Sequence, residues 1–212
     1  GNTVSAIGQT KTLPQRSDPV KFAVCSCSNY PAGYFHVYKE MAQESNLDVI
    51  IHLGDYIYEY GQGGYATDDA QQLGRTFATD NDKEIINLDD YRKRYALYRT
   101  DADLQAAHQR HPFIVIWDDH ELSNDTWEAG ADNHQEDEGS FIERKLAALQ
   151  AYFEWMPIRP VAENDHLNIY RQFDFGGLVN LMMLDTRILA RHKQLNYNDY
   201  MTATGIDAVK FQ

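Results

Sequence analysis

The stretch VIIHLGDYIYEY, residues 49–60, joins an apolar run to an acidic residue and several tyrosines. Asp55 follows the apolar run directly, and Tyr58 lies three positions further on. A carboxylate oxygen can bridge two cations, and a phenolate is a charged, polarizable ligand that favours an oxidised transition metal over calcium or magnesium. An aspartate at a strand end more commonly caps the following turn, so Asp55 taken alone leaves both interpretations open.

A second apolar run, VKFAVCSC at residues 20–27, ends in a cysteine. The thiolate of Cys27 would be a further polarizable metal ligand. A lone buried cysteine is also commonly a small packing residue, which is the role we expect for Cys25. The two cysteines lie one residue apart on an expected strand, so their side chains point to opposite faces and a disulfide between them is geometrically poor.

A third apolar run, HPFIVIW at residues 111–117, is followed by Asp118, Asp119 and His120, and then by Asn124. Asp119 and Asn124 offer oxygen ligands for a harder second cation. His120, beside a bound phosphate, could donate a proton or a hydrogen bond to a leaving oxygen. Carboxylates with few cations to pair them make this group a predicted metal site.

The three apolar runs must be buried strands if these side chains are to meet. Their near-continuous apolar character is typical of a parallel sheet covered on both faces. Between the first two strands, residues 33–46 predict a helix with one face formed by Tyr34, Val37, Tyr38 and Met41. A right-handed crossover places the strand ends on one edge of the sheet, and ligands of open α/β sheets bind beyond that edge.

Helices and a loop are predicted for the middle of the chain. Residues 61–87 are polar and glycine-rich, which indicates a long functional or mobile loop. Asp101 is a plausible N-cap of a short helix. Two other helices are indicated by stripes of larger side chains, namely Leu88, Tyr91, Tyr95 and Tyr98, and then Ile142, Leu146, Leu149 and Phe153.

A hairpin is predicted near the C-terminal side, where residues 168–175 and 178–185 flank Gly176-Gly177 as a two-residue turn. Arg187 follows the hairpin. Its guanidinium either contacts phosphate at the rim of the site or forms a structural salt bridge.

Composition limits the partners. The chain has 212 residues, which suits one domain, and a formal net charge of −13. This charge disfavours nucleic acid as a partner, because phosphate backbones are bound by clustered Lys and Arg, and no such cluster is evident in the sequence. An acidic protein can still act on phosphates if metal ions supply the positive charge. No apolar stretch reaches the roughly 20 residues that a membrane helix needs.

Four segments in order, FAVCSC, HLGDYIYEY, WDDHE and MLDTR, resemble successive signatures of the PhoD-like alkaline phosphatases and phosphodiesterases, in the calcineurin-like metallophosphoesterase superfamily. The resemblance spans residues 20–187. It implies an α/β fold, a layered α/β/β/α sandwich. It also implies Fe(3+) and Ca(2+) as cofactors, and small-molecule phosphate mono- and diesters as substrates of a periplasmic or secreted enzyme.

The resemblance further assigns individual residues. Cys27 and Tyr58 match the family's iron-binding thiolate and phenolate, and Asp55 matches its bridging aspartate. Asp119 matches a metal ligand of the wider superfamily, and Asn124 matches an asparagine that helps to hold calcium. His120 matches the superfamily histidine that contacts the phosphate.

Family members continue to a later strand ending in Gly-Asp-x-His, whose Asp and His complete the metal site, and this sequence lacks that motif. GQTKTLP near the start resembles the linker after a small β domain in longer relatives. We therefore expect residues 1–19 to be a linker after an N-terminal β domain. Residues 20–212 would be the N-terminal portion of the catalytic domain, truncated before the final strands.

The predicted function is hydrolysis of phosphate mono- and diesters by a metal-bound hydroxide, with His120 assisting the leaving alkoxide. One alternative is a catalytically incomplete fragment that folds and binds cations without turnover. A second alternative is a thiol enzyme that uses Cys27 with His120. The oligomeric state and the preferred ester stay open.

Overall fold

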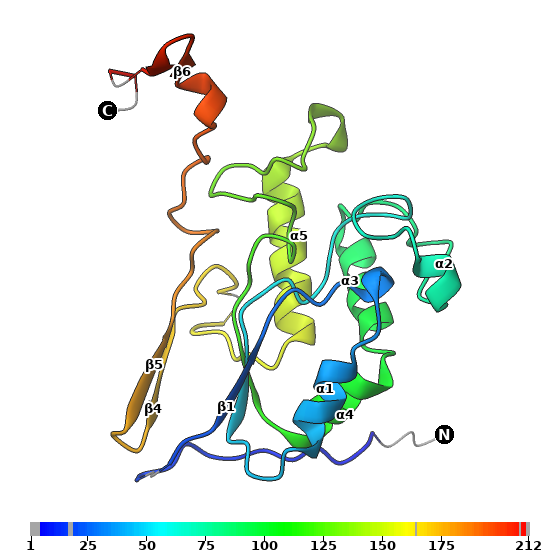
Figure 1. Ribbon diagram of the computed structural model, residues 1–212. Coiled ribbons are helices and arrows are strands. Elements are labelled where there is room, and N and C mark those ends of the chain that lie inside the picture. The colour runs from blue at the N-terminus through cyan, green and yellow to red at the C-terminus, as the bar shows by residue number, and fades with distance from the viewer. Residues whose placement is uncertain (1–4, 17–18, 164, 208, 211–212) are drawn as a thin grey trace.

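The computed structural model describes residues 5–16, 19–163, 165–207 and 209–210 (Figure 1). Its centre is a parallel sheet in the order β1-β2-β3, formed by β1 (Phe22–Cys25), β2 (Val49–His52) and β3 (Phe113–Val115). All four residues of β2 are buried, as expected for the central strand of a parallel sheet covered on both faces. The predicted α/β class with a parallel sheet is confirmed.

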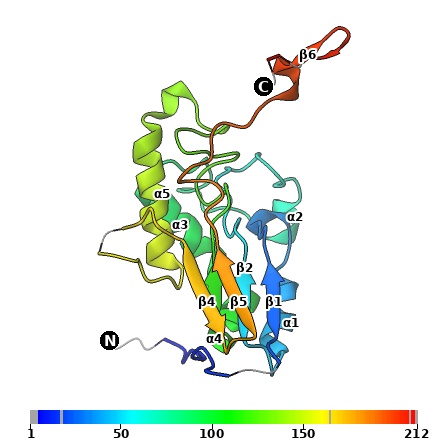
Figure 2. The same cartoon turned by 90° about the vertical axis from the view of Figure 1, so that its left-hand side faces the viewer.

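Helices α1 (His36–Gln43), α3 (Leu88–Tyr98), α4 (Ala102–Arg110) and α5 (Phe141–Trp155) cover one face of this sheet (Figure 2). The single-turn α2 (Ala70–Leu73) and the short 3-10 helices η1 (Tyr30–Ala32), η2 (Glu136–Glu138) and η3 (Tyr197–Asp199) lie in the connecting segments. Helix α1 packs beside α4, and α3 packs beside α5 (Figure 1). Asp101 caps α4 as predicted, since its side chain accepts hydrogen bonds from the amides of Asp103 and Leu104.

The hairpin of β4 (Arg171–Phe175) and β5 (Val179–Met183) lies across the other face of the sheet, on the side away from α1 and α4 (Figure 2). Phe175 packs edge-on against Phe22 of β1, with ring centroids 4.9 Å apart. Pairing of Phe175 with Val179 leaves three connecting residues, so the predicted two-residue turn was too short. A two-stranded hairpin of β6 (Met201–Thr202) and β7 (Gly205–Ile206) projects from the body.

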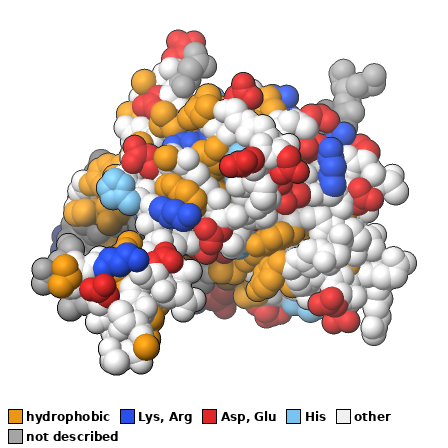
Figure 3. All heavy atoms as spheres, turned by 90° about the horizontal axis from the view of Figure 1, so that it is seen from above, with side chains coloured by type: hydrophobic (Ala, Val, Ile, Leu, Met, Phe, Trp, Pro, Cys, Tyr) orange, Lys and Arg blue, Asp and Glu red, His pale blue; other side chains and the backbone are white. Residues whose placement is uncertain are grey.

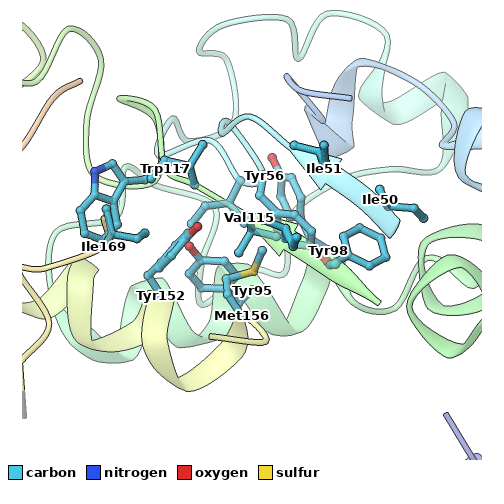
Figure 4. Close-up of a cluster of buried hydrophobic side chains, with 14 of the residues drawn as sticks. Ile50, Ile51, Tyr56, Tyr95, Tyr98, Val115, Trp117, Tyr152, Met156 and Ile169 are labelled. Carbon is cyan, nitrogen blue, oxygen red and sulfur yellow. The ribbon is translucent and has the colours of Figure 1, made fainter. Parts of the chain in front are cut away.

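The core fills the space between the sheet and the pair α3 and α5 (Figure 4). The predicted stripe on α3 is confirmed for Tyr91, Tyr95 and Tyr98, which are fully buried, while Leu88 is half-buried. Trp117 and Tyr152 meet edge to face at 5.4 Å. Large aromatic side chains, packed with aliphatic ones, therefore contribute to the contact between the helices and the strands.

Two predicted helix faces were wrong in part. On the first, Tyr38 is buried as predicted, but Val37 is more than half exposed, and so is Tyr34, which precedes the start of α1 at His36. On α5, Leu149 is buried as predicted, but Ile142 and Leu146 are more than half exposed.

The buried face of α5 instead includes Arg144 and Lys145. Arg144 donates to the Glu84 carboxylate and the Tyr91 hydroxyl, and Lys145 donates to two backbone carbonyls. Charged side chains that find such partners can take core positions that an apolar pattern would assign elsewhere.

Residues 5–16 form an extended segment along the lower edge of the sheet (Figure 1). Gln9 donates its amide to the Gln109 carbonyl at 2.7 Å, and Lys11 donates to the Leu47 carbonyl at 2.7 Å. Residues 1–4 and 17–18 of the predicted linker lie outside the described residues. Within the described chain, no helix has the length and apolarity needed to cross a membrane.

Candidate metal centre

The predicted convergence of the strand ends is observed at the carboxyl edge of the sheet. The amide of Cys27 donates to the Gly54 carbonyl at 3.1 Å, and the amide of Ser28 donates to the Asp55 carbonyl at 2.8 Å. These bonds continue the pairing of β1 and β2 by two residues. They place the Cys27 and Asp55 side chains next to each other.

Gly54 lets the loop after β2 approach the loop after β3. Its φ is 107°, and a Cβ atom there would lie 2.2 Å from the backbone nitrogen of Asp118. No other residue fits such a distance without moving the backbone. The glycine thus explains the Gly-Asp pair in the sequence, because it brings Asp55 beside the Asp118-Asp119 segment.

Asp55, Asp119 and His120 each offer a donor atom, and these atoms all lie within 4.8 Å of one another. The thiol of Cys27 and the hydroxyl of Tyr58 both donate to Oδ2 of Asp55, each at 3.4 Å. A cation that displaced these two protons would meet a carboxylate, a thiolate and a phenolate. The residues present therefore fit a transition metal with anionic ligands.

The metal-free site favours the protonated forms of these ligands. Partial burial of the exposed Cys27, burial of Tyr58 and the neighbouring Asp55 carboxylate raise the pKa values of the thiol and the phenol. Burial, together with repulsion from Asp118 and Asp119, raises the pKa of Asp55 against the opposing effect of His120. Negative charges so close together disfavour one another, and a cation between them removes that penalty.

Backbone strain is concentrated at this site. Among the described non-glycine residues, those with positive φ are Cys27 (61°), Asp55 (55°), Ala66 (55°) and Asp125 (53°). Three of the four belong to the loops that carry the donor groups. Left-handed backbone at ordinary residues costs free energy and is found most often at functional sites.

His120 is oriented by a buried carboxylate. Its Nδ1 lies 2.7 Å from Oε2 of Glu59, whose side chain is fully buried. Burial lowers the pKa of His120, but the pairing with Glu59 outweighs this effect, and the pKa is raised to about 9. The other oxygen of Glu59 accepts from the Asn124 amide at 2.7 Å and from the Asn133 side chain at 2.8 Å. With Nδ1 bound to Glu59, Nε2 is the nitrogen left for other partners.

The loop after His120 brings the other predicted ligands near. Oδ2 of Asp119 accepts from the amide of Asp125 at 2.5 Å. Asn124 is half-buried in the same loop, and its carbonyl accepts from the amides of Asp132 and Asn133. The backbone of Asn124 is therefore held beside the site by hydrogen bonds, and the role of its side chain as a ligand stays a prediction.

Arg187 reaches the site and forms ion pairs with the acids. Its Nε lies 2.5 Å from Asp118, its Nη2 lies 3.2 Å from Asp119, and its Nη1 lies 3.6 Å from Asp125. The salt-bridge alternative is therefore observed, with acids of the candidate site as the partners. The contact of Arg187 with phosphate stays a prediction.

Beside Cys27 lies a hollow of about 360 Å³, lined on one side by Cys27, Tyr58 and Tyr65. Tyr65 stacks on Tyr58 with ring centroids 5.9 Å apart. In the view from above, acidic side chains are spread over this end of the molecule among a few basic ones (Figure 3).

Glu59 and Arg94 are among the buried charged residues that the sequence analysis missed. Glu59 directly follows Tyr58, and Arg94 lies on α3. The guanidinium of Arg94 donates to the carbonyls of Tyr58 and Tyr60 and to Asn81. The signal for Arg94 was its helical spacing with the tyrosine stripe, because a charged residue on a buried face must have buried partners.

Comparison with known proteins agrees with this geometry. The family model described as "PhoD-like phosphatase" matches residues 22–209. Alkaline phosphatase D of Bacillus subtilis (strain 168) is 44% identical over 192 residues, which cover 88% of this chain and 32% of that protein. A solved structure titled "Structure of PhoD" matches with a TM-score of 0.72 and 42% identity, over 85% of this chain and 34% of that chain.

The chain thus spans about a third of the length of the relatives it matches. The family match covers the strands, helices and strand-end loops described above. The chain belongs to the PhoD-like phosphatase family.

Proposed function

We propose that this chain takes part in the metal-dependent hydrolysis of phosphate mono- and diesters, as a phosphoric ester hydrolase. The observation that carries the proposal is the convergence of Asp55, Asp119 and His120 within 4.8 Å at the carboxyl edge of the sheet. Support comes from a relative named alkaline phosphatase D, which is 44% identical to this chain. Phosphate esters repel an acidic site, so cations are needed to bring substrate and carboxylates together.

We assign the metal ligands as predicted from the sequence. Cys27, Asp55 and Tyr58 would hold Fe(3+), and Asp119 and Asn124 would contribute to a site for Ca(2+). When bound, such ions neutralise phosphoryl oxygens and convert water to a nucleophilic hydroxide at neutral pH. The shared contact of the thiol and the phenol with one oxygen of Asp55 supports the first assignment.

His120 is the proposed proton donor to the leaving alkoxide. Glu59 accepts from Nδ1 and keeps the ring oriented, while the ring stacks on Tyr58 with centroids 4.2 Å apart. An imidazole held in this way can deliver a proton or hydrogen bond from Nε2. Arg187 would contact phosphate once a cation competes for its acidic partners.

The thiol enzyme is disfavoured by the environment of Cys27. A nucleophilic cysteine needs a lowered pKa, usually from a nearby cation, whereas partial burial and Asp55 raise the pKa of this thiol. The alternative of cation binding without turnover is kept, because this chain spans about a third of the relatives' length. The proposed periplasmic or secreted location rests on the family resemblance.

The test is hydrolysis of p-nitrophenyl phosphate and bis-p-nitrophenyl phosphate by the purified chain. We expect turnover that a strong chelator abolishes and that Fe(3+) with Ca(2+) restores, and we expect Asp55→Asn to lose it. The surface variant Glu143→Gln should keep full activity. Cation binding without turnover would favour the non-catalytic alternative, and activity that survives chelation but not thiol alkylation would favour the thiol enzyme.

A further inference from the structure

Glu121 joins the two loops that carry the predicted ligands. Its side chain is buried, with 2% of the residue surface exposed. One oxygen, Oε2, accepts from the amide of Asp55 at 2.9 Å and from the amide of Asp118 at 2.8 Å. The other oxygen, Oε1, accepts from the amide of Tyr56 at 2.5 Å. One carboxylate therefore binds three backbone amides, two after β2 and one after β3.

These three amides lie in strained or crowded backbone. Asp55 has φ of 55°, and Gly54 is in close contact with the backbone of Asp118. Parallel strands separate beyond their ends, and among the described residues no backbone hydrogen bond joins residues 55–56 to residue 118. A buried side chain whose two oxygens accept from three backbone amides fixes such a conformation, because each of these amides would otherwise lack a partner.

We propose that Glu121 is a positioning residue, whose carboxylate holds the loops after β2 and β3 so that Asp55 and Asp119 converge before a cation binds. The proposal rests on the metal-dependent function above. Within the described residues, the hydrogen bonds of the Glu121 side chain go to backbone amides, so Glu121 acts on the ligands through the backbone. Its effect is on the geometry of the ligands, in the way that outer groups orient the ligands of other metal sites.

The variant Glu121→Gln tests the proposal, because glutamine keeps the size of the side chain but replaces one acceptor oxygen with an amide donor. At least one backbone amide then faces another donor and loses its partner. We expect the affinity of the metal-free protein for Co(2+) to fall about 10–100-fold. The absorption spectrum of bound Co(2+) should also change, since it reports ligand number and geometry.

A matched control separates positioning from general stability. Asp101 is also a buried carboxylate that accepts from two backbone amides, at the start of α4. Asp101→Asn should lower the thermal midpoint while leaving the Co(2+) affinity and spectrum unchanged. Equal weakening of Co(2+) binding in both variants would overturn the positioning role.

The wild-type protein gives a second test that does not depend on a variant folding. In the metal-free protein, the amides of Asp55, Tyr56 and Asp118 should exchange slowly with solvent deuterium. Fast exchange would overturn the proposal, because the hydrogen bonds from these amides to Glu121 would then not be formed before metal binding. Unchanged Co(2+) affinity in Glu121→Gln would overturn this inference and leave the proposed function standing, whereas a wild-type protein that binds no metal would overturn both.

Discussion

The aromatic core between α3, α5 and the sheet differs from the strand-end loops in what fixes its side chains. In the core, Tyr91, Tyr95 and Tyr98 lie on one regular helix and are placed by its period and by burial. In the loops, Asp55 and His120 lie on irregular backbone and are placed by buried charged groups, chiefly Glu59 and the neighbouring Glu121. The difference teaches that packing builds the scaffold, whereas a network of hydrogen bonds sets the geometry of the site.

The first prediction tests the hydrogen bonds of Arg94, a fully buried member of this network. Arg94 donates to five oxygens in two loops and has no carboxylate partner among its hydrogen bonds. Lysine has only three donors, so Arg94→Lys leaves buried carbonyls unpaired. We expect the free energy of unfolding to fall by about 3 kcal/mol, measured by urea denaturation.

Its control lies on the same helix. Arg92 pairs with Glu154 at the surface, and Arg92→Lys should change the free energy of unfolding by less than about 0.5 kcal/mol. Equal stability of the two variants would show that Arg94 does not hold the loops.

The second prediction separates activity from stability. Glu59→Gln removes the acceptor that orients His120 and two other donors. We expect phosphoesterase activity to fall about 10–100-fold. The double variant Glu59→Gln with His120→Asn should have nearly the same activity as His120→Asn alone, because both substitutions act through the His120 imidazole. Additive losses in the double variant would contradict that coupling.

The third prediction compares two tyrosines inside the core. Tyr91 donates to the Leu122 carbonyl at 2.5 Å and accepts from Arg144 at 3.1 Å. The hydroxyl of Tyr95 is buried and has no hydrogen-bond partner within the described residues. Tyr91→Phe should therefore lower the free energy of unfolding by about 1–2 kcal/mol, while Tyr95→Phe should leave it unchanged or raise it. Thermal unfolding of both variants checks this, and the reverse order would refute the assignment.

The fourth prediction concerns pH. Burial, with the nearby Arg99 and His52, lowers the pKa of His108 to about 2. The unfolded chain takes up this proton near pH 6.5, so it binds more protons than the folded chain below that pH, and stability falls as pH falls.

His108 should contribute about 1 kcal/mol of lost stability between pH 6 and 5. His108→Leu removes that contribution, so its stability curve should be flatter over this interval than the wild-type curve. Parallel curves from urea unfolding at several pH values would contradict a neutral buried His108.

The sequence predicted what depends on periodic burial and on motifs. The three strands, the tyrosine stripe of α3 and the cap at Asp101 were placed correctly, because each follows from apolar continuity, helical spacing or capping chemistry. The meeting of Cys27, Asp55 and Asp119 followed from the shared edge of a parallel sheet.

The sequence could not predict features that depend on tertiary partners. The predicted inward face of α5 was wrong at Ile142 and Leu146, because Arg144 and Lys145 take buried positions by finding acceptors in distant segments. Glu59 was missed for the same reason, since its partners His120 and Asn133 lie more than sixty residues away. Local pattern carries no information on such contacts.

The most direct test of the central claim is elemental analysis of the purified chain and of Asp55→Asn, with metal from any affinity tag excluded. The account predicts near-stoichiometric iron in the wild-type chain and its loss in the variant, because Asp55 is the carboxylate that Cys27 and Tyr58 both contact. Equal metal content in the two proteins, or none in either, would contradict a metal centre at this edge of the sheet.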